Sequence, residues 1–368
     1  MKKVLILTAS TGEGHNQAAN SIGETLSANN FKCIKYEFLK SRCNFLNKLI
    51  VKGYEILASK FPTFYGKFYS FTDSSKTNII LKPIFKLTSL RIKKIINNFD
   101  ADLIIGTHPM TVNVITMLKK NGLKTPFISI VTDFKAHYTY INPLVDAYIT
   151  GSTYTKTSLI KRGISESKIY PIGIPIRKSF YTKDDNILYL KDKEYLSILL
   201  MGGSMGLSKI SFVLEELLNN KNKLRITVVC GNNTKLEKTL ISKCSKTHYN
   251  NKKIHILGYT TDIPHLMEYS DVIITKPGGL TVSEAIVKNI PIIIPFVIPG
   301  QEMENTDFLV SNNYAYYIKN LNNINNLIDS FINNKDTLNI MKHNLNQLSS
   351  TYSNNKLLDI VNNLLGKK

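Results

Sequence analysis

A chain of 368 residues is longer than the roughly 250–300 at which a single hydrophobic core stops growing, so its length favours two domains. It contains no run of the roughly 20 apolar residues that a membrane-spanning helix needs, so a helical integral membrane protein is excluded. The formal net charge of +20 indicates an anionic partner, such as nucleic acid, an anionic membrane surface or a phosphorylated substrate. Drift towards lysine is the alternative explanation of this charge.

The first half of the chain alternates short apolar runs with helical patterns. Val4–Thr8 reads as a buried strand, and a helix is expected from about Asn16 to Ala28. Further apolar runs predict strands at Leu103–Gly106, Phe127–Thr132 and Ala147–Thr150. Continuous rather than alternating apolar runs are expected where helices cover both faces of a parallel sheet. We therefore predict a doubly wound α/β domain over residues 1–181.

A basic and aromatic region, Ser41–Asn97, precedes the strand at Leu103. Such an amphipathic stretch can rest in a membrane interface, with Lys48, Lys52, Lys60 and Lys67 close to anionic lipid. Ordinary amphipathic helices, whose lysines extend into solvent, are the alternative.

The α/β rhythm restarts after a charged stretch, residues 182–194, which we predict to be a linker. Strands are expected at Leu196–Met201, Arg225–Cys230, Ile254–Leu257, Val272–Thr275 and Pro291–Pro295. Helical patterns at Ser211–Leu218, Ile263–Tyr269 and Leu280–Lys288 separate some of them. We predict a second α/β domain over residues 195–345. Residues 346–368 are expected to form a C-terminal helix that packs back on the first domain.

The first strand is followed by the turn Thr8-Ala-Ser-Thr-Gly-Glu-Gly-His15. Gly12 and Gly14 permit a tight turn that a ligand can approach closely, and the start of the following helix favours negative charge. His15 is expected at the carboxyl edge of the sheet, where ligands of doubly wound folds bind. The spacing is not the GxGxxG of a dinucleotide-binding turn.

Three segments of the second domain carry groups suited to a nucleotide. Gly202-Gly-Ser-Met-Gly206 can cradle a diphosphate with backbone N–H groups but lacks the lysine of a P-loop. In Lys276-Pro-Gly-Gly-Leu-Thr-Val-Ser-Glu284, the glutamate can accept both hydroxyls of a ribose, although the helix dipole would also favour a plain surface glutamate there. The segment Pro299-Gly-Gln-Glu-Met-Glu-Asn305 supplies polar groups that can form hydrogen bonds with the hydroxyls of a sugar.

Metal ligation is not expected. Asp100-Ala-Asp102 precedes a strand and therefore lies at the amino edge of the sheet, away from the ligand edge, as a solvated turn. Cys33, Cys43, Cys230 and Cys244 lack the spacing of a zinc site and are expected to be reduced thiols.

Together these segments resemble the monogalactosyldiacylglycerol synthase and processive diacylglycerol glucosyltransferase family, which is related to the lipid-linked N-acetylglucosaminyltransferase of cell-wall synthesis. The matching pieces are the TGEGH turn, Gly106-Thr-His-Pro109, Val131-Thr-Asp133, Ile172-Gly-Ile-Pro-Ile-Arg177, Met201-Gly-Gly-Ser204, Lys276–Ala285 and Pro299–Glu302.

The resemblance implies a GT-B fold, in which two Rossmann-like domains face each other across a cleft. It further implies an inverting enzyme that moves glucose or galactose from UDP-glucose or UDP-galactose to diacylglycerol. No cofactor, essential metal or nucleic-acid partner is implied. The expected location is cytoplasmic, peripheral on the inner face of the cell membrane and in contact with anionic lipids.

The resemblance also assigns roles to residues by motif. The ribose would be bound by Glu284 and the hexose by Gln301 and Glu302. His15 and Asp133 would be catalytic, with Asp133 either the general base or the group that orients His15. The diphosphate would be lined by Gly203, Ser204 and Met205, with Gly278, Gly279, Leu280 and Thr281 nearby. The acceptor side would include Gly12, Gly14 and His108, the last of which could equally be a packed strand-end histidine.

Three other functions stay open at this point. A lipid-linked N-acetylglucosaminyltransferase would use the same groups. A sugar-nucleotide 2-epimerase shares the two-domain architecture but needs no lipid acceptor. The charge alone would also allow nucleic-acid binding, although no known nucleic-acid-binding module is recognisable.

Overall fold

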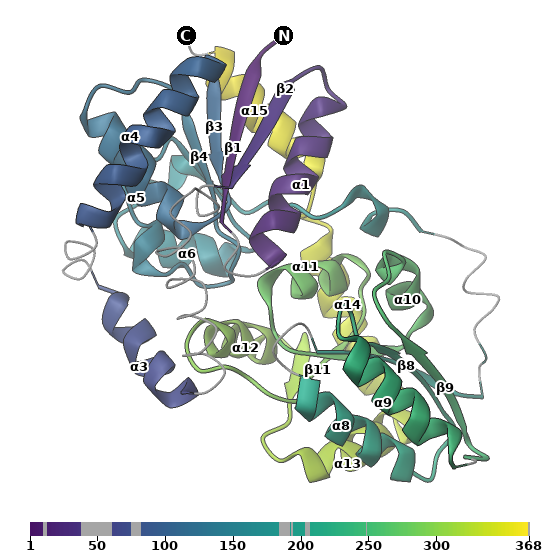
Figure 1. Cartoon of the computed structure of the whole chain (residues 1–368). Coiled ribbons are helices and arrows are strands. Elements are labelled where there is room, and N and C mark those ends of the chain that lie inside the picture. Colours follow the sequence, from purple (N-terminus) through teal and green to yellow (C-terminus); the bar gives the residue numbers. More distant parts are fainter. Residues whose placement is uncertain are drawn as a thin grey trace.

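The computed structural model describes residues 1–9, 13–37, 61–74, 82–183, 192, 194–202, 207–247 and 249–366 (Figure 1). Two α/β units lie one above the other, each built on a parallel sheet of six strands. The described residues include no helix with the length and apolar character needed to cross a membrane. The α/β fold class expected from the apolar runs is confirmed.

The sheet of the first unit has the strand order β2-β1-β3-β4-β5-β6. Its strands are β1 (Lys3–Thr8), β2 (Lys32–Glu37), β3 (Leu103–Gly106), β4 (Phe127–Ile130), β5 (Ala147–Ile149) and β6 (Ile169–Tyr170). All neighbours are parallel, and Val4 of β1 is in register with Leu103 of β3.

Helices cover both faces of this sheet, as its continuous apolar strands require. Successive side chains of β1 alternate between the faces. Leu5 and Leu7 pack with α4 (Lys82–Phe99) and α5 (Pro109–Lys120). Val4 and Ile6 pack with α1 (Glu13–Ser27) and α15 (Asn354–Gly366). The described part of this unit also contains the α-helices α3 (Pro62–Thr72) and α6 (Thr153–Lys161).

The sheet of the second unit has the strand order β12-β11-β10-β7-β8-β9. Its strands are β7 (Leu196–Met201), β8 (Leu224–Val229), β9 (Lys252–Leu257), β10 (Val272–Thr275), β11 (Ile292–Ile294) and β12 (Ala315–Tyr317). One face is covered by α8 (Leu207–Asn219), α9 (Thr234–Ser245) and α13 (Ile324–Asn333). The other face carries α10 (Ile263–Tyr269), α11 (Gly279–Val287) and α12 (Gln301–Ser311), while α14 (Lys335–Ser349) contributes to the packing on both faces.

Each sheet has one point at which the strand order reverses. In the first sheet the reversal falls between β1 and β3, and in the second it falls between β7 and β10. Ligands of open α/β sheets bind outside the carboxyl ends of the strands at such a reversal. Asp102 lies at the opposite, amino edge, where its carboxylate accepts a hydrogen bond of 2.9 Å from the backbone N–H of Lys3.

The chain returns to the first unit at its end. Leu357, Ile360 and Val361 of α15 belong to the core cluster of Val4 and Ile6 (Figure 1). The predicted boundary after residue 345 lies inside α14, and the return to the first unit begins after that helix, at residue 350. The linker predicted at residues 182–194 falls largely outside the described residues.

Candidate functional site

The two reversal points meet where the units touch. The end of β1 leads into α1, and the end of β10 leads through Lys276-Pro-Gly-Gly279 into α11. A Cβ atom added to Gly279 would lie 1.9 Å from the backbone carbonyl oxygen of Thr132, so only glycine allows this approach between the units. A Cβ atom added to Gly14 would lie 3.7 Å from the Cβ of Leu280, which is an ordinary contact distance. Gly279 therefore serves the contact between the two units as well as the turn.

His15 is held at the start of α1 by the neighbouring strand end. Its Nδ1 lies 2.7 Å from the carbonyl oxygen of Thr107 and 3.2 Å from the hydroxyl of Thr132. A carbonyl oxygen can only accept, so Nδ1 carries the proton and Nε2 keeps its lone pair. Burial lowers the pKa of His15 to about 4, although the bond to Thr107 acts in the other direction. His15 is thus a neutral, oriented imidazole whose Nε2 can accept a proton.

His108 has a structural role that explains its position. Its Nδ1 accepts a hydrogen bond of 3.2 Å from the backbone N–H of Met110 and so caps the first turn of α5. Its ring packs edge-on against that of His15, with 4.6 Å between ring centroids. Burial, followed by repulsion from His15 when that ring is protonated, lowers the pKa of His108 well below its usual value. His108 therefore caps α5 and packs against His15, and its predicted contact with the acceptor stays a prediction.

Asp133 lies in the contact between the units. Its Oδ1 accepts hydrogen bonds from the side-chain amides of Gln301, at 2.5 Å, and Asn305, at 3.4 Å. Burial raises the pKa of Asp133 to about 6, against the effect of these two bonds. The orientation of His15, one of the two roles expected of Asp133, is provided by Thr107 and Thr132.

The unusual pKa of Asp133 has a consequence for stability. A carboxyl whose pKa is raised by folding stabilises the protein most at low pH, and that contribution is lost as pH rises from about 4 to about 6. The loss corresponds to about 3 kcal/mol. The side chain of Asp133→Asn cannot ionise, so this variant does not lose that contribution. Between pH 4 and pH 7 we therefore expect the free energy of unfolding of the unmodified protein to fall by about 3 kcal/mol more than that of the variant. Denaturant unfolding at several pH values measures it. Asp359→Asn, which changes an exposed carboxyl on α15, is the control. Parallel curves for Asp133→Asn and the unmodified protein would contradict the expectation.

Glu284 is the most unusual carboxyl of the second unit. It lies on α11 with 9% of its surface exposed, and none of the described residues donates a hydrogen bond to its side chain. Burial raises its pKa to about 8, while the charge of Arg177 acts in the opposite direction. Because buried carboxyls are normally paired, this one is suited to receive donors from a ligand.

Gln301 and Glu302 have partners within the protein. Gln301 donates to Asp133, as described above. Glu302 forms an ion pair with Lys276 at 2.8 Å and accepts a hydrogen bond of 3.0 Å from the backbone N–H of Ile298. The Lys276 motif and the Pro299–Glu302 loop are therefore joined. Contact of Gln301 and Glu302 with a hexose stays a prediction.

The other predicted site residues divide into two groups. Gly278 and Gly279 lie at the N-terminus of α11, followed by Leu280 and Thr281 in its first turn. Free backbone N–H groups at such a terminus attract anions. Gly12 and the predicted diphosphate cradle Gly203, Ser204 and Met205 lie outside the described residues.

Asn305 is a site residue to which the sequence motif gave no role. It is fully buried on α12, accepts a hydrogen bond of 2.9 Å from the backbone N–H of Phe134, and donates one of 3.0 Å to the carbonyl oxygen of Pro277. One amide thus fastens the two units together beside Asp133. Its spacing of four residues from Gln301, which places both on one helix face, is the signal available in the sequence.

Comparison with known proteins covers nearly the whole chain. Residues 15–176 match the family model of monogalactosyldiacylglycerol (MGDG) synthase, and residues 197–363 match the glycosyltransferase family 28 C-terminal domain. A processive diacylglycerol beta-glucosyltransferase of Bacillus subtilis (strain 168) is 30% identical over 368 residues, which cover 97% of this chain and 94% of the relative. The chain belongs to the family of monogalactosyldiacylglycerol synthases and processive diacylglycerol glucosyltransferases.

Solved structures place this glycosyltransferase in the GT-B fold. MurG of Acinetobacter baumannii aligns with a TM-score of 0.66 and 16% identity over the full length of both chains. A putative UDP-N-acetylglucosamine 2-epimerase of Listeria monocytogenes aligns with a TM-score of 0.62 and 11% identity, covering 100% of this chain and 98% of the other. Transferases and epimerases share this fold, so the sequence relationship, rather than the fold, identifies the glycosyltransferase family.

Proposed function

We propose that this enzyme transfers glucose from UDP-glucose to diacylglycerol in a membrane, with inversion at the anomeric carbon. The observation that carries the proposal is that the reversal point of each sheet presents one group suited to this chemistry. One is the buried carboxyl of Glu284, to which no described residue donates, and the other is the neutral, oriented imidazole of His15. The name of the Bacillus subtilis relative supports glucose as the sugar and diacylglycerol as the acceptor.

In the proposed reaction, Glu284 accepts hydrogen bonds from the two ribose hydroxyls of the donor. The acceptor hydroxyl oxygen attacks the anomeric carbon from the face opposite the leaving group and passes its proton to Nε2 of His15. The bond from the anomeric carbon to the diphosphate oxygen breaks, and UDP leaves with the electron pair. A single displacement of this kind inverts the anomeric carbon.

The negative charge that develops on the leaving UDP needs stabilisation. The N-terminus of α11, at Gly278 and Gly279, supplies backbone N–H groups and the positive end of the helix dipole. We propose that these groups, together with the cradle predicted at Gly203, Ser204 and Met205, hold the diphosphate. Close contact of the units at Gly279 and Thr132 would help exclude water, which would otherwise hydrolyse the donor.

We further propose that the enzyme works on the inner face of the cell membrane, where anionic lipids attract its charge of +20. Of the four lysines predicted to meet the membrane, Lys67 is exposed on α3, and Lys48, Lys52 and Lys60 lie outside the described residues.

A transfer assay tests the proposed function. Purified enzyme is incubated with vesicles that contain diacylglycerol and, separately, with labelled UDP-glucose, UDP-galactose or UDP-N-acetylglucosamine. We expect labelled glucosyldiacylglycerol from UDP-glucose, identified by chromatography of the lipid extract, which also shows how many sugars each lipid receives. Vesicles without diacylglycerol are the control. No glycolipid from any donor would refute the proposal, and conversion of UDP-N-acetylglucosamine without an acceptor would indicate an epimerase.

A further inference from the structure

Helix α3 exposes a row of phenylalanines. Phe61, at its N-cap, and Phe64, Phe68 and Phe71 are separated by three, four and three residues, which places them on one side of the helix. Each side chain is at least half exposed, at 58%, 61%, 50% and 64% respectively. We call these four residues the phenylalanine face. The helix contains no acidic residue, and its one charged residue, Lys67, is exposed.

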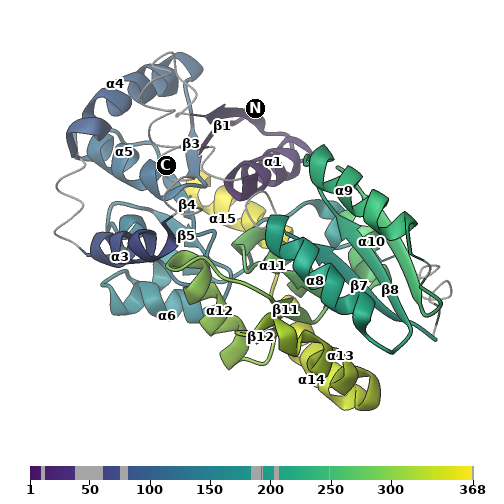
Figure 2. The same ribbon diagram turned by 60° about the horizontal axis from the view of Figure 1, so that its bottom comes forward.

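The opposite side of α3 packs on the second unit. The ring of Tyr69 lies against Gly300, where an added Cβ atom would come within 2.9 Å of Cγ of Tyr69. A Cβ atom on Gly66 would lie 2.7 Å from Cβ of Pro299. The hydroxyl of Tyr69 donates a hydrogen bond of 2.9 Å to Glu304 on α12, and Figure 2 shows the two helices side by side. The inner side of α3 therefore contacts the loop that immediately precedes Gln301.

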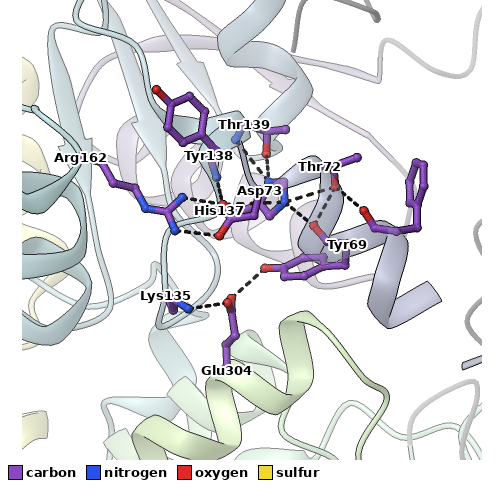
Figure 3. Close-up of polar contacts among 10 residues, drawn as sticks. Tyr69, Thr72, Asp73, Lys135, His137, Tyr138, Thr139, Arg162 and Glu304 are labelled. Carbon is purple, nitrogen blue, oxygen red and sulfur yellow. Dashed lines mark hydrogen bonds and ion pairs between the residues drawn. The ribbon is translucent and has the colours of Figure 1, made fainter. Parts of the chain in front are cut away.

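The C-terminal end of α3 is fastened to the first unit (Figure 3). Both terminal nitrogens of the Arg162 guanidinium donate to the carboxylate of Asp73, at 2.5 and 2.8 Å, and the backbone N–H of Tyr138 donates at 2.6 Å. Lys135 of the first unit also pairs with Glu304, at 2.7 Å. The helix thus bridges the two units, while each side chain of its phenylalanine face stays at least half exposed.

We infer that α3 lies in the lipid–water interface with its phenylalanine face in the acyl region, and that this contact favours the arrangement in which Tyr69 holds the Pro299–Gln301 loop. The bilayer is chosen as the partner because aromatic rings beside an exposed lysine, on a chain of charge +20, complement an anionic lipid surface. The inference rests on the proposed function, in which the acceptor is a membrane lipid.

The consequence is a coupling between the membrane and the donor side of the site. The loop that α3 contacts leads directly into Gln301, which donates to Asp133. If the membrane binds one arrangement of α3 more tightly than another, it increases the fraction of enzyme molecules in that arrangement. By linkage, a ligand that also prefers this arrangement then binds more tightly. Vesicles without diacylglycerol should therefore raise the affinity for UDP.

The first test concerns the phenylalanine face. We expect the double substitution Phe64→Ser and Phe68→Ser to weaken binding to vesicles of phosphatidylglycerol and phosphatidylcholine by about tenfold or more, because two rings no longer enter the acyl region. Co-sedimentation measures this without any sugar transfer, so the result is independent of the proposed reaction. Phe212→Ser, at an exposed aromatic residue of α8, is the matched control. The affinity of both variants for UDP in the absence of vesicles should equal that of the unmodified enzyme. This measurement is the control for correct folding. Unchanged vesicle binding in the double variant would overturn the inference.

The second test concerns the coupling. Tyr69→Phe keeps the ring against Gly300 but removes the hydrogen bond to Glu304. We expect vesicle binding to stay unchanged, while the increase in UDP affinity that vesicles cause, about fivefold or more in the unmodified enzyme, is largely lost. Tyr259→Phe, at an exposed tyrosine of the second unit, is the control. Equal increases in Tyr69→Phe and the unmodified enzyme, or no increase in either, would overturn the coupling.

Discussion

We expect His15→Gln to lower the rate of glucose transfer by roughly 10²- to 10⁴-fold, the contribution usual for a positioned general base. Glutamine fills a similar volume and can donate to the Thr107 carbonyl as Nδ1 of His15 does, but it cannot accept the proton of the acceptor hydroxyl. Turnover at saturating UDP-glucose and diacylglycerol measures the effect. The affinity for UDP should stay close to that of the unmodified enzyme because Glu284 and α11 are untouched.

The pH dependence of the rate separates His15 from Asp133 as the base. With a pKa of about 4, His15 is neutral throughout the physiological range, so the rate should fall only as pH approaches 4. With a pKa of about 6, Asp133 would produce an acid limb near pH 6. An acid limb near pH 6 together with full activity of His15→Gln would assign the base to Asp133. His265→Gln, at an exposed histidine of α10, controls for the substitution itself.

The second large effect is expected at Glu284. We expect Glu284→Ala to weaken UDP binding by roughly 10²- to 10⁴-fold, because the variant loses two hydrogen bonds from ribose hydroxyls, and each contributes about 1.5–3 kcal/mol to a charged carboxylate. Calorimetric titration with UDP measures the change. Glu194→Ala, at an exposed glutamate that pairs with Lys223, is the control within the same unit. Equal UDP affinity in Glu284→Ala and the unmodified enzyme would remove Glu284 from the donor site.

The raised pKa of Glu284 adds a pH signature to this effect. Donors from a ribose favour the charged carboxylate, so binding should lower the pKa from its value of about 8. The affinity for uridine should then rise with pH up to about 8 and level off above it. Uridine is preferred to UDP because it carries no titrating phosphate. The same titration of Glu284→Ala should be flat over this range.

The central strands could be predicted from the sequence because burial alone specifies them. The apolar runs at Leu103–Gly106, Leu196–Met201 and Val272–Thr275 coincide with β3, β7 and β10. Edge strand β2 was missed because it is half-exposed and carries lysines, so its pattern differs little from that of a loop. The helix expected from Asn16 begins earlier, at Glu13, since the residues of a first turn need not be apolar.

The parts of the site that could be predicted are those that a strand end determines. A glycine turn after a buried strand must lie at the carboxyl edge of the sheet. In the structure, His15 lies at the start of α1 after β1, and Gly279 and Glu284 lie on α11 after β10. The partners of these residues could not be predicted in the same way. The carbonyl of Thr107, which orients His15, carries no side-chain signal, and the contacts of Asn305 with Phe134 join residues 171 positions apart in the chain.

The return of α15 to the first sheet has a consequence for how the enzyme is made. Leu357, Ile360 and Val361 contribute to the core around Val4 and Ile6, so the strands of the first sheet are synthesised long before α15, which packs on them. N-terminal domains generally fold while the ribosome is still extending the chain. Helix α1 covers part of the sheet face that carries Val4 and Ile6, and the part that α15 covers stays open until α15 has left the exit tunnel. The first unit therefore matures only after the second has been made, and a nascent chain that stalls late would expose an apolar surface to chaperones.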